Sequence, residues 1–383
     1  MEANADKPTI LIMTDWYLPG VKAGGPIRSC VNFTRQMSDQ YAIFILTADR
    51  DFNEDSPYPN IPIDEWTDHY TGAQVYYASP DTLKTRSLKD IITGVNPDFV
   101  YLNSMFSVWF TLVPLFLKWR GLFNAKVILA PRGMLHKGAL QFKALKKNSF
   151  LTLAKLTRLT SNITFQATDQ QEAKDIRRSF PKADITVLGN FPQSDQPIWI
   201  SREKQAGEMN LVFVSRVAPK KNPLFLLECL KAVKGNIHLE IVGPIEEQAY
   251  WAKCQAIIDN FPGSHQVTLT GQVDHQEIQE RLNKAHFFVL PTFGENFGHA
   301  IFEAFLAGCP VIISDQTPWQ DLQSHKAGWD IPLNQPETYQ LALTKAIQMD
   351  QAEYDVWSKG SWEFAKNFLA SSNLKVEYQN LFS

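Results

Sequence analysis

The chain alternates short apolar runs with longer stretches of helical periodicity from one end to the other. This alternation is typical of α/β proteins, in which helices cover a mostly parallel sheet. In the first half, apolar runs predict strands over 10–13, 41–46, 74–77, 99–102, 126–130, 163–166 and 185–188. In the second half, they predict strands over 211–215, 238–242, 267–270, 287–290 and 310–313, with helices near 223–231, 246–259, 276–283 and 297–307.

A polar stretch over 191–208, with Pro192 and Pro197, separates the two series and predicts an interdomain linker. We expect an N-terminal Rossmann-like domain over 1–190 and a second Rossmann-like domain over 209–355. Helices over 356–383 are expected to pack back toward the first domain. The predicted fold class is therefore α/β, with two doubly wound domains that face a central cleft at the carboxyl ends of their strands.

Length and composition agree with a globular protein of this size. The chain has 383 residues, 44% of them hydrophobic and 20% charged, and roughly twice the length of a usual domain. Its first residues lack the pattern of a secretory signal, and no apolar run reaches about 18 residues. Four scattered cysteines favour reduced thiols. We therefore expect a cytoplasmic protein.

Charge is unevenly distributed along the sequence. Residues 99–168 contain ten Lys or Arg and no Asp or Glu. Since the whole chain has a net charge of –3 and this segment has +10, the rest of the chain has –13. Such a segment suits anionic lipid, a phosphorylated substrate or nucleic acid, or else a surface balanced by acidic neighbours. Apolar residues within 137–158 predict either an interfacial helix or a helix that faces the core. We hypothesise peripheral contact with the inner face of the cytoplasmic membrane, and expect no nucleic-acid binding because no recognisable module is present.

The densest set of chemical groups lies in Pro291-Thr-Phe-Gly-Glu-Asn-Phe-Gly-His-Ala-Ile-Phe-Glu303. It follows a predicted strand and opens a helix, where free backbone N–H groups and the helix dipole favour an anion. Glu295 and Glu303 could bracket a ligand and accept hydrogen bonds from sugar hydroxyls. The alternative is an ordinary helix-terminal carboxylate and a solvated helix residue.

Two further segments carry candidate ligand groups. Ser215-Arg-Val-Ala-Pro-Lys-Lys-Asn222 places Arg216 at a strand end and Lys221 at a helix start, where cations suit a diphosphate, unless this is a solvated basic loop. After the first strand, Gly24-Gly25 allows close approach of a ligand to the main chain, although a dinucleotide fingerprint is lacking. Asp49-Arg50-Asp51 is formally a metal motif, and we interpret it as solvated loop charge.

With these segments, the sequence resembles the family 4, or group 1, retaining glycosyltransferases, which have the GT-B fold. The resemblance rests on Glu295-x7-Glu303, Ser215-Arg216-x4-Lys221, Ile241-Val-Gly-Pro244, Gly24-Gly25 and Pro131-Arg-Gly-Met-Leu135, in the family's order. It implies transfer of a sugar from a UDP- or GDP-sugar with retention of configuration, without a metal or other cofactor.

The resemblance also implies roles for individual residues. Arg216 and Lys221 would hold the diphosphate as it leaves, and Glu295 would contact sugar hydroxyls. Main-chain groups of 296–299 (Asn296, Phe297, Gly298, His299) would touch the phosphate and donor sugar. Glu303 would bind the ribose, and Gly24 and Gly25 would lie beside the phosphates. Arg216, Lys221 and Glu295 are thus the predicted catalytic residues.

The chain departs from the family pattern in one place. Many relatives carry a His after the strand that ends here at Ala130, where this chain has Pro131-Arg132-Gly133 with His136 further along. No base is assigned, and Arg132 and His136 are candidates for the acceptor side. A missing base fits a front-face mechanism in which the leaving phosphate accepts the acceptor's proton.

The sequence therefore predicts a glycosyltransferase that acts on a glycan or lipid-linked acceptor, in the biosynthesis of bacterial capsule, O-antigen or exopolysaccharide. Two alternatives stay open: a non-catalytic GT-B partner subunit, and another nucleotide-sugar enzyme such as an epimerase.

Overall fold

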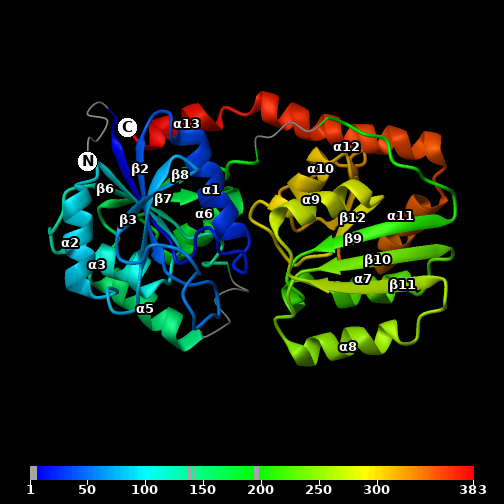
Figure 1. Ribbon diagram of the computed structural model, residues 1–383, viewed down its shortest axis with the longest axis horizontal. Helices are drawn as coiled ribbons and strands as arrows, with labels where there is room; N and C mark the ends of the chain where they lie inside the picture. Colours follow the sequence, from blue (N-terminus) through cyan, green and yellow to red (C-terminus); the bar gives the residue numbers. More distant parts are fainter. Residues whose placement is uncertain (1–6, 137–139, 141–143, 194–197) are drawn as a thin grey trace. The chain divides into compact units, whose positions relative to one another are not determined.

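The computed structural model describes residues 7–136, 140, 144–193 and 198–383. The chain folds as two compact units, Met1–Phe191 with Asn373–Ser383, and Pro192–Ser372. Each unit has one central sheet with helices on its faces (Figure 1). The α/β fold class with two doubly wound units is confirmed.

The first unit is built on an eight-stranded sheet with the order β3-β4-β2-β1-β5-β6-β7-β8. Its strands are β1 Thr9–Met13, β2 Ala42–Ala48, β3 Trp66–His69, β4 Ala73–Ala78, β5 Phe99–Asn103, β6 Lys126–Ala130, β7 Ile163–Ala167 and β8 Asp184–Val187. All pairings are parallel except that of β3 with β4. The edge strand β3 was not predicted because its sequence, Trp-Thr-Asp-His, contains no apolar run.

Both faces of this sheet are buried, because alternate residues of each strand point to opposite sides. On β1, Ile10 and Ile12 belong to one hydrophobic cluster, and Leu11 and Met13 belong to another. The helices that cover the faces are α1 Gly25–Met37, α2 Thr85–Val95, α3 Val113–Trp119, α5 Ala144–Leu156 and α6 Gln170–Ser179. A π-helical turn, Val108–Leu112, precedes α3.

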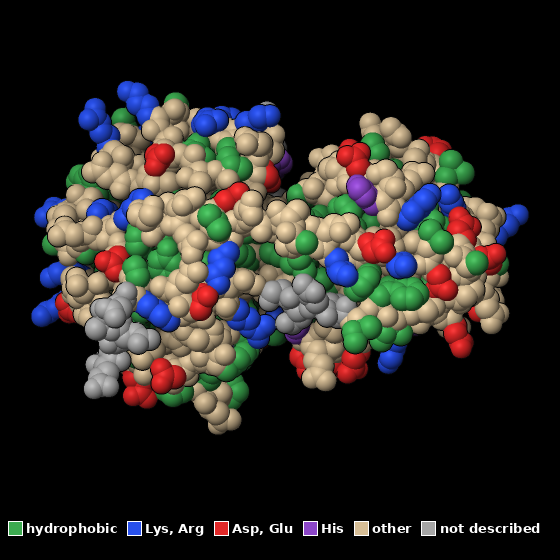
Figure 2. Space-filling model, turned by 90° about the horizontal axis from the view of Figure 1, so that it is seen from above, with side chains coloured by type: hydrophobic (Ala, Val, Ile, Leu, Met, Phe, Trp, Pro, Cys, Tyr) green, Lys and Arg blue, Asp and Glu red, His purple; other side chains and the backbone are tan. Residues whose placement is uncertain are grey.

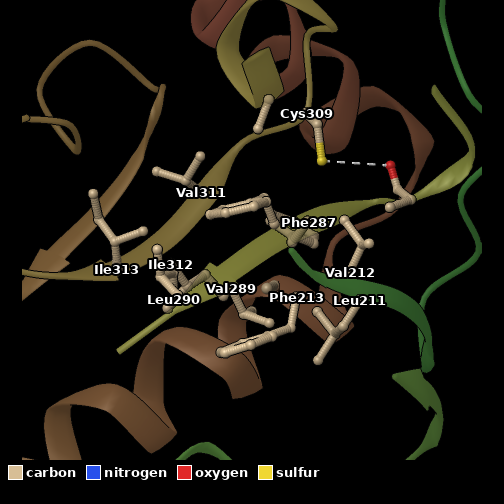
Figure 3. Packing of buried hydrophobic residues seen from close by; sticks show 14 of the residues in the cluster. Leu211, Val212, Phe213, Phe287, Val289, Leu290, Cys309, Val311, Ile312 and Ile313 are labelled. Atoms are coloured by element: carbon tan, nitrogen blue, oxygen red, sulfur yellow. Dashed lines mark hydrogen bonds between the residues drawn. The ribbon is translucent and has the colours of Figure 1, made fainter. Parts of the chain in front are cut away.

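The second unit has a wholly parallel sheet with the order β11-β10-β9-β12-β13-β14. Its strands are β9 Glu208–Val214, β10 Asn236–Val242, β11 His265–Gly271, β12 Phe287–Leu290, β13 Val311–Ser314 and β14 Gly328–Ile331. Figure 3 shows the centre of the core, where Phe213, Phe287 and Ile312 pack among other apolar side chains from β9, β12 and β13. The helices are α7 Pro223–Leu230, α8 Gln248–Ile258, α9 His275–Lys284, α10 His299–Leu306, α11 Pro336–Gln348 and α12 Gln351–Ser371.

The predicted linker and the last helix belong to different units. The predicted linker, 191–208, lies almost wholly in the second unit, where Arg202 and Lys204 are buried. The last helix, α13 Leu374–Leu381, returns to the first unit. There the ring of Tyr378 stacks on Phe191, and Phe382 packs against Phe33.

Within the described residues, no helix is long and apolar enough to cross a membrane. On the face that Figure 2 shows, Lys and Arg side chains are spread over the surface with Asp and Glu among them. Lys137 and Lys143 of the predicted basic segment lie outside the described residues.

Candidate functional site

The loops that carry the predicted donor-side residues meet at one edge of the second sheet. Arg216 follows β9, Glu246 follows β10, Glu295 follows β12, and Gln316 follows β13. These four strands are neighbours and parallel, so their carboxyl ends share an edge. This is the place where open α/β sheets bind ligands.

Main-chain hydrogen bonds brace these loops against one another. The N–H of Val217 donates to Pro244 O at 2.9 Å, and the N–H of Phe293 donates to Lys220 O at 2.8 Å. The loop after β10 passes so close to β9 that a Cβ on Gly243 would lie 2.1 Å from Ser215 O. Only glycine fits there, with a φ of 141°. The charged side chains are therefore presented by a rigid frame.

Lys221 and Glu295 form an ion pair at the centre of this frame. Lys221 Nζ donates to Glu295 Oε1, and each side chain is only 14% exposed. Burial alone would raise the pKa of Glu295, but the charge and hydrogen bond of Lys221, with the charge of Lys220, lower that pKa below its ordinary value. Glu295 is therefore ionised at neutral pH, and Lys221, a paired side chain that is 14% exposed, does not fit the alternative of a solvated basic loop.

Arg216 is also paired, with a residue that the sequence did not single out. Its Nη1 donates to Glu246 Oε2 at 2.8 Å, and both side chains are more than one-third exposed. Lys220 lies beside the same cations, and desolvation, followed by the charge of Lys221, lowers its pKa. The cluster thus holds three cations against two carboxylates, which leaves it electropositive.

The helix after this loop starts later than predicted. α10 begins at His299 rather than near residue 297, so Glu303 lies about one turn into the helix. Gly298, the residue before the helix, has a φ of 76° that favours glycine. The ring of Phe297 is buried against Trp319, so this side chain belongs to the core of the second unit.

Glu303 is buried rather than solvated. It is 6% exposed, and its Oε1 lies 3.9 Å from Nδ1 of His275, the first residue of α9. A buried carboxylate is rare unless a polar or charged group contacts it. The alternative of a solvated helix residue is wrong, and His275 is a contact that the sequence did not suggest.

In the first unit, the glycine loop lies at the carboxyl end of β1. Gly24 has a φ of 66° and precedes α1, whereas Gly25 has no such requirement. A Cβ on Gly25 would meet nothing within 4 Å, so the fold itself does not require glycine there. A site that must admit a ligand close to the main chain would account for it.

Asp51 supports this glycine loop, which corrects the interpretation of Asp49-Arg50-Asp51 as solvated charge. Asp51 Oδ2 accepts hydrogen bonds from the N–H groups of Val21 and Lys22 at 2.8 and 3.1 Å. Asp49 is 3% exposed and pairs with Arg50 at 2.7 Å. The described residues contain no cluster of three or more His, Cys, Asp or Glu that could hold a metal ion.

The acceptor-side candidates follow β6. The guanidinium of Arg132 is fixed among side-chain oxygens of Tyr101, Asn103 and Asn190. His136 is exposed on the same loop, and its backbone N–H donates to Gly133 O at 3.2 Å. Sequence reasoning missed Glu172, whose Oε1 accepts the N–H of Gly133 at 2.5 Å and holds the loop from α6.

Known proteins match part of this chain in sequence. Residues 196–361 match the family model described as glycosyl transferases group 1. Among curated proteins, an uncharacterized glycosyltransferase of Methanocaldococcus jannaschii is 23% identical over 42% of this chain and 43% of the relative. A capsular polysaccharide biosynthesis glycosyltransferase of Staphylococcus aureus is 27% identical over 36% of this chain and 38% of the relative. The matches thus span less than half of these relatives' length.

Solved structures are similar over nearly the whole chain. Sucrose-phosphate synthase from Thermosynechococcus elongatus has a TM-score of 0.72 with 16% identity, over 98% of both chains. Anabaena HepE, in complex with UDP and glucose, has a TM-score of 0.70 with 13% identity, also over 98% of both chains. At such low sequence identity, the structural similarity establishes the fold alone, which is GT-B. Residues 196–361 thus resemble the group 1 glycosyltransferases, and the chain as a whole shares its fold with the solved structures.

Proposed function

We propose that this protein transfers a sugar from a nucleotide-diphosphate sugar to an acceptor hydroxyl, with retention of configuration and without a metal. One observation carries the proposal: Arg216, Lys220 and Lys221 gather with Glu295 in the loops beside the N-terminus of α10. Cations and helix N–H groups together provide the charge that a departing diphosphate needs.

The ion pairs suggest how a diphosphate would be received. Its oxygens can replace the carboxylate of Glu246 at Arg216, because that pair is partly exposed and therefore weak. They can share Lys221 with Glu295, whose second oxygen would then face the sugar hydroxyls. In this scheme Glu303 would accept hydrogen bonds from the ribose hydroxyls, and the open space at Gly25 would admit a phosphate close to the main chain.

The chemical step needs no protein base in this scheme. The bond between the anomeric carbon and the phosphate oxygen breaks as the acceptor oxygen bonds to that carbon from the same face. The acceptor's proton passes to the leaving phosphate oxygen. The fixed cations then stabilise the nucleotide diphosphate product, the role that a divalent ion has in other enzymes.

The substrates are proposed by class. The donor is a UDP- or GDP-sugar, since a structure similar in fold binds UDP and glucose. The acceptor is a glycan or a lipid-linked sugar of a bacterial surface polysaccharide, in line with the capsular polysaccharide glycosyltransferase among the relatives. Family 4 membership and a cytoplasmic location complete this proposal.

The site assignment is tested by Lys221→Ala and Glu295→Ala. Each should lower kcat/KM by at least about a hundredfold, because each removes a charged group from the reacting centre. The matched control is Lys231→Ala, which removes an exposed lysine paired with Glu228 in the same unit and should leave turnover unchanged. Turnover is measured as nucleotide release from a panel of UDP- and GDP-sugars. Near-normal activity in both site variants would disprove the assignment.

We also propose peripheral binding to anionic membrane through the first unit. Phe116 and Trp119 of α3 are 43% and 50% exposed, and Leu122 beyond its end is 41% exposed, with Arg120 next to Trp119 in the chain. Exposed aromatic side chains next to basic ones suit a lipid interface. Flotation with anionic liposomes should recover the wild type at low salt, and Trp119→Ser should reduce recovery. Ile63→Ser, which alters an apolar residue 36% exposed beside Asp64 in the same unit, should not. Absence of salt-sensitive flotation would refute this contact.

A further inference from the structure

The guanidinium of Arg132 is surrounded by neutral oxygens. Its Nε donates to Asn103 Oδ1 at 3.2 Å, its Nη2 donates to the same oxygen and to Tyr101 Oη at 2.5 and 2.8 Å, and its Nη1 donates to Asn190 Oδ1. Asn103 and Asn190 are themselves buried. These bonds fix the orientation of the guanidinium and involve four of its five N–H donors.

None of the ion pairs found among the described residues includes Arg132. The carboxylate of Glu172 is engaged elsewhere, with the N–H of Gly133 and with the N–H and hydroxyl of Thr168. Arginine has no neutral form in proteins, so its positive charge persists without a contacting carboxylate. Such a charge lowers stability when it is removed from water.

The backbone at this position is also unfavourable. Arg132 has a φ of 54°, in the left-handed region, and Gly133 follows with 73°. A non-glycine residue with this conformation is strained by about 1 kcal/mol or more, and such residues cluster at ligand sites. The hydrogen bond from Gly133 to Glu172 secures the strained turn.

The place of Arg132 in the fold suggests why the strain and the charge are present. It follows the carboxyl end of β6, and β1, β5 and β6 are adjacent parallel strands, so it shares a sheet edge with the Gly24-Gly25 loop. The residue is only partly buried. A fixed guanidinium that, among the described residues, contacts no carboxylate and keeps one Nη1 N–H unused is suited to bind an oxyanion through its charge and that remaining donor.

We propose that Arg132 binds an oxyanion on one of the two sugar substrates, a carboxylate or a phosphate, and thereby selects an acidic sugar. This inference rests on the proposed function and adds to it the charge class of a substrate. The oxyanion can belong to the donor, as in a uronic acid, or to the acceptor, as in a sugar phosphate or a uronoside.

Asn103→Asp separates this role from a structural one. The substitution keeps the size of the side chain and places a carboxylate at hydrogen-bond distance from Nε and Nη2. If Arg132 serves stability alone, the new ion pair raises the Tm and leaves ligand preference intact. If Arg132 binds a substrate oxyanion, the new carboxylate neutralises and repels it, so the Tm rises while the preference is lost.

The experiment uses the full chain and pairs of probes that differ in charge. The donor pair is UDP-glucose and UDP-glucuronic acid. The acceptor set, measured in the presence of UDP, is methyl glucoside against methyl glucuronoside and glucose 1-phosphate. Wild type should bind at least one acidic probe about tenfold or more tightly than its neutral twin, the scale of a charge-assisted hydrogen bond. Asn103→Asp and Arg132→Met should both abolish that difference, and the second variant decides if the first does not fold.

Each outcome assigns or overturns the inference. A preference confined to the donor pair places the oxyanion on the donor, and one confined to the acceptor set places it on the acceptor. UDP or GDP binding without any acidic preference, or with a preference that survives both substitutions, overturns the role of Arg132 and leaves the proposed function standing. Failure of the wild type to bind either nucleotide overturns the proposed function, and this inference with it.

Discussion

Two arginines in this protein are held by oxygens rather than by carboxylates, and their surroundings differ in one respect. Arg202, in the second unit, donates to the main-chain oxygens of Leu282, Asn283, Ala307 and Gly308. These carbonyls lie at the C-terminal ends of α9 and α10. Arg132, in the first unit, donates only to side-chain oxygens of Tyr101, Asn103 and Asn190.

The difference is one of charge compensation. The C-terminus of a helix carries about half a negative charge, so two helix ends balance the guanidinium of Arg202. Amide and phenol oxygens carry no such aligned dipole, and the nearby carboxylate of Glu172 makes its hydrogen bonds to Gly133 and Thr168 instead of to Arg132. By the number of their hydrogen bonds alone, the two arginines would be indistinguishable. Asking what neutralises each charge separates a structural arginine from a ligand-binding one.

The largest effect expected is on stability at Arg202. Arg202→Met should lower the free energy of unfolding by about 3–5 kcal/mol, because it leaves buried carbonyls from two helix ends without donors. Thermal or denaturant unfolding measures this, with Arg86→Met, an exposed arginine in the first unit, as control. A loss no greater than that of the control would show that the helix ends do not depend on Arg202.

The surroundings of Arg202 should also make the second unit sensitive to acid. His286 is 6% exposed, and its Nδ1 accepts the N–H of Asn210 at 3.0 Å. Burial first, and then the nearby charges of Lys204 and Arg202, lower the pKa of His286 from 6.5 to about 4. Between these values the unfolded chain binds a proton that the folded chain does not, so stability falls as pH falls.

The whole shift corresponds to about 3 kcal/mol lost between pH 6.5 and pH 4. Unfolding followed at pH 7.5, 5.5 and 4.5 should show this slope in the wild type and a shallower one in His286→Gln. His325→Gln, at an exposed position of the same unit, serves as the control. Equal slopes in all three proteins would assign the acid sensitivity to other groups.

The smallest effect on stability is expected at Arg132. Arg132→Met should change the free energy of unfolding by no more than about 1 kcal/mol, because removal of an uncompensated charge offsets the lost hydrogen bonds. The measurement is the one used for Arg202→Met, so the two variants can be compared directly. A loss at Arg132 as large as at Arg202 would erase the distinction between the two sites.

Sequence reasoning recovered what periodicity and local spacing encode. Buried parallel strands are continuous apolar runs, so β1, β5 and β12 were predicted within a residue or two. The loops after β9 and β12 were placed at strand ends, which is enough to bring Lys221 and Glu295 to one edge of the sheet. The edge strands β3 and β14 lack such runs and were missed.

What the sequence could not supply is the partner of each charge. Asp51 and Glu172 bind backbone N–H groups, and Arg202 binds backbone oxygens, none of which leaves a mark in the residue pattern. The polar stretch over 191–208 was therefore interpreted as a linker. In the structure, Arg202 and Lys204 are buried and donate hydrogen bonds to main-chain carbonyls that are distant in sequence. Glu246 was missed for the same reason, because its pairing with Arg216 depends on the adjacency of β9 and β10.

The return of α13 to the first unit affects the order in which the protein can mature. Tyr378, Leu381 and Phe382 belong to the same core as Ile10 and Phe33, yet the ribosome adds them after the entire second unit has been made. The first unit therefore cannot complete its hydrophobic core until the last helix has been synthesised, and part of that core stays exposed until then. During that interval it is the half more open to aggregation and more dependent on chaperones.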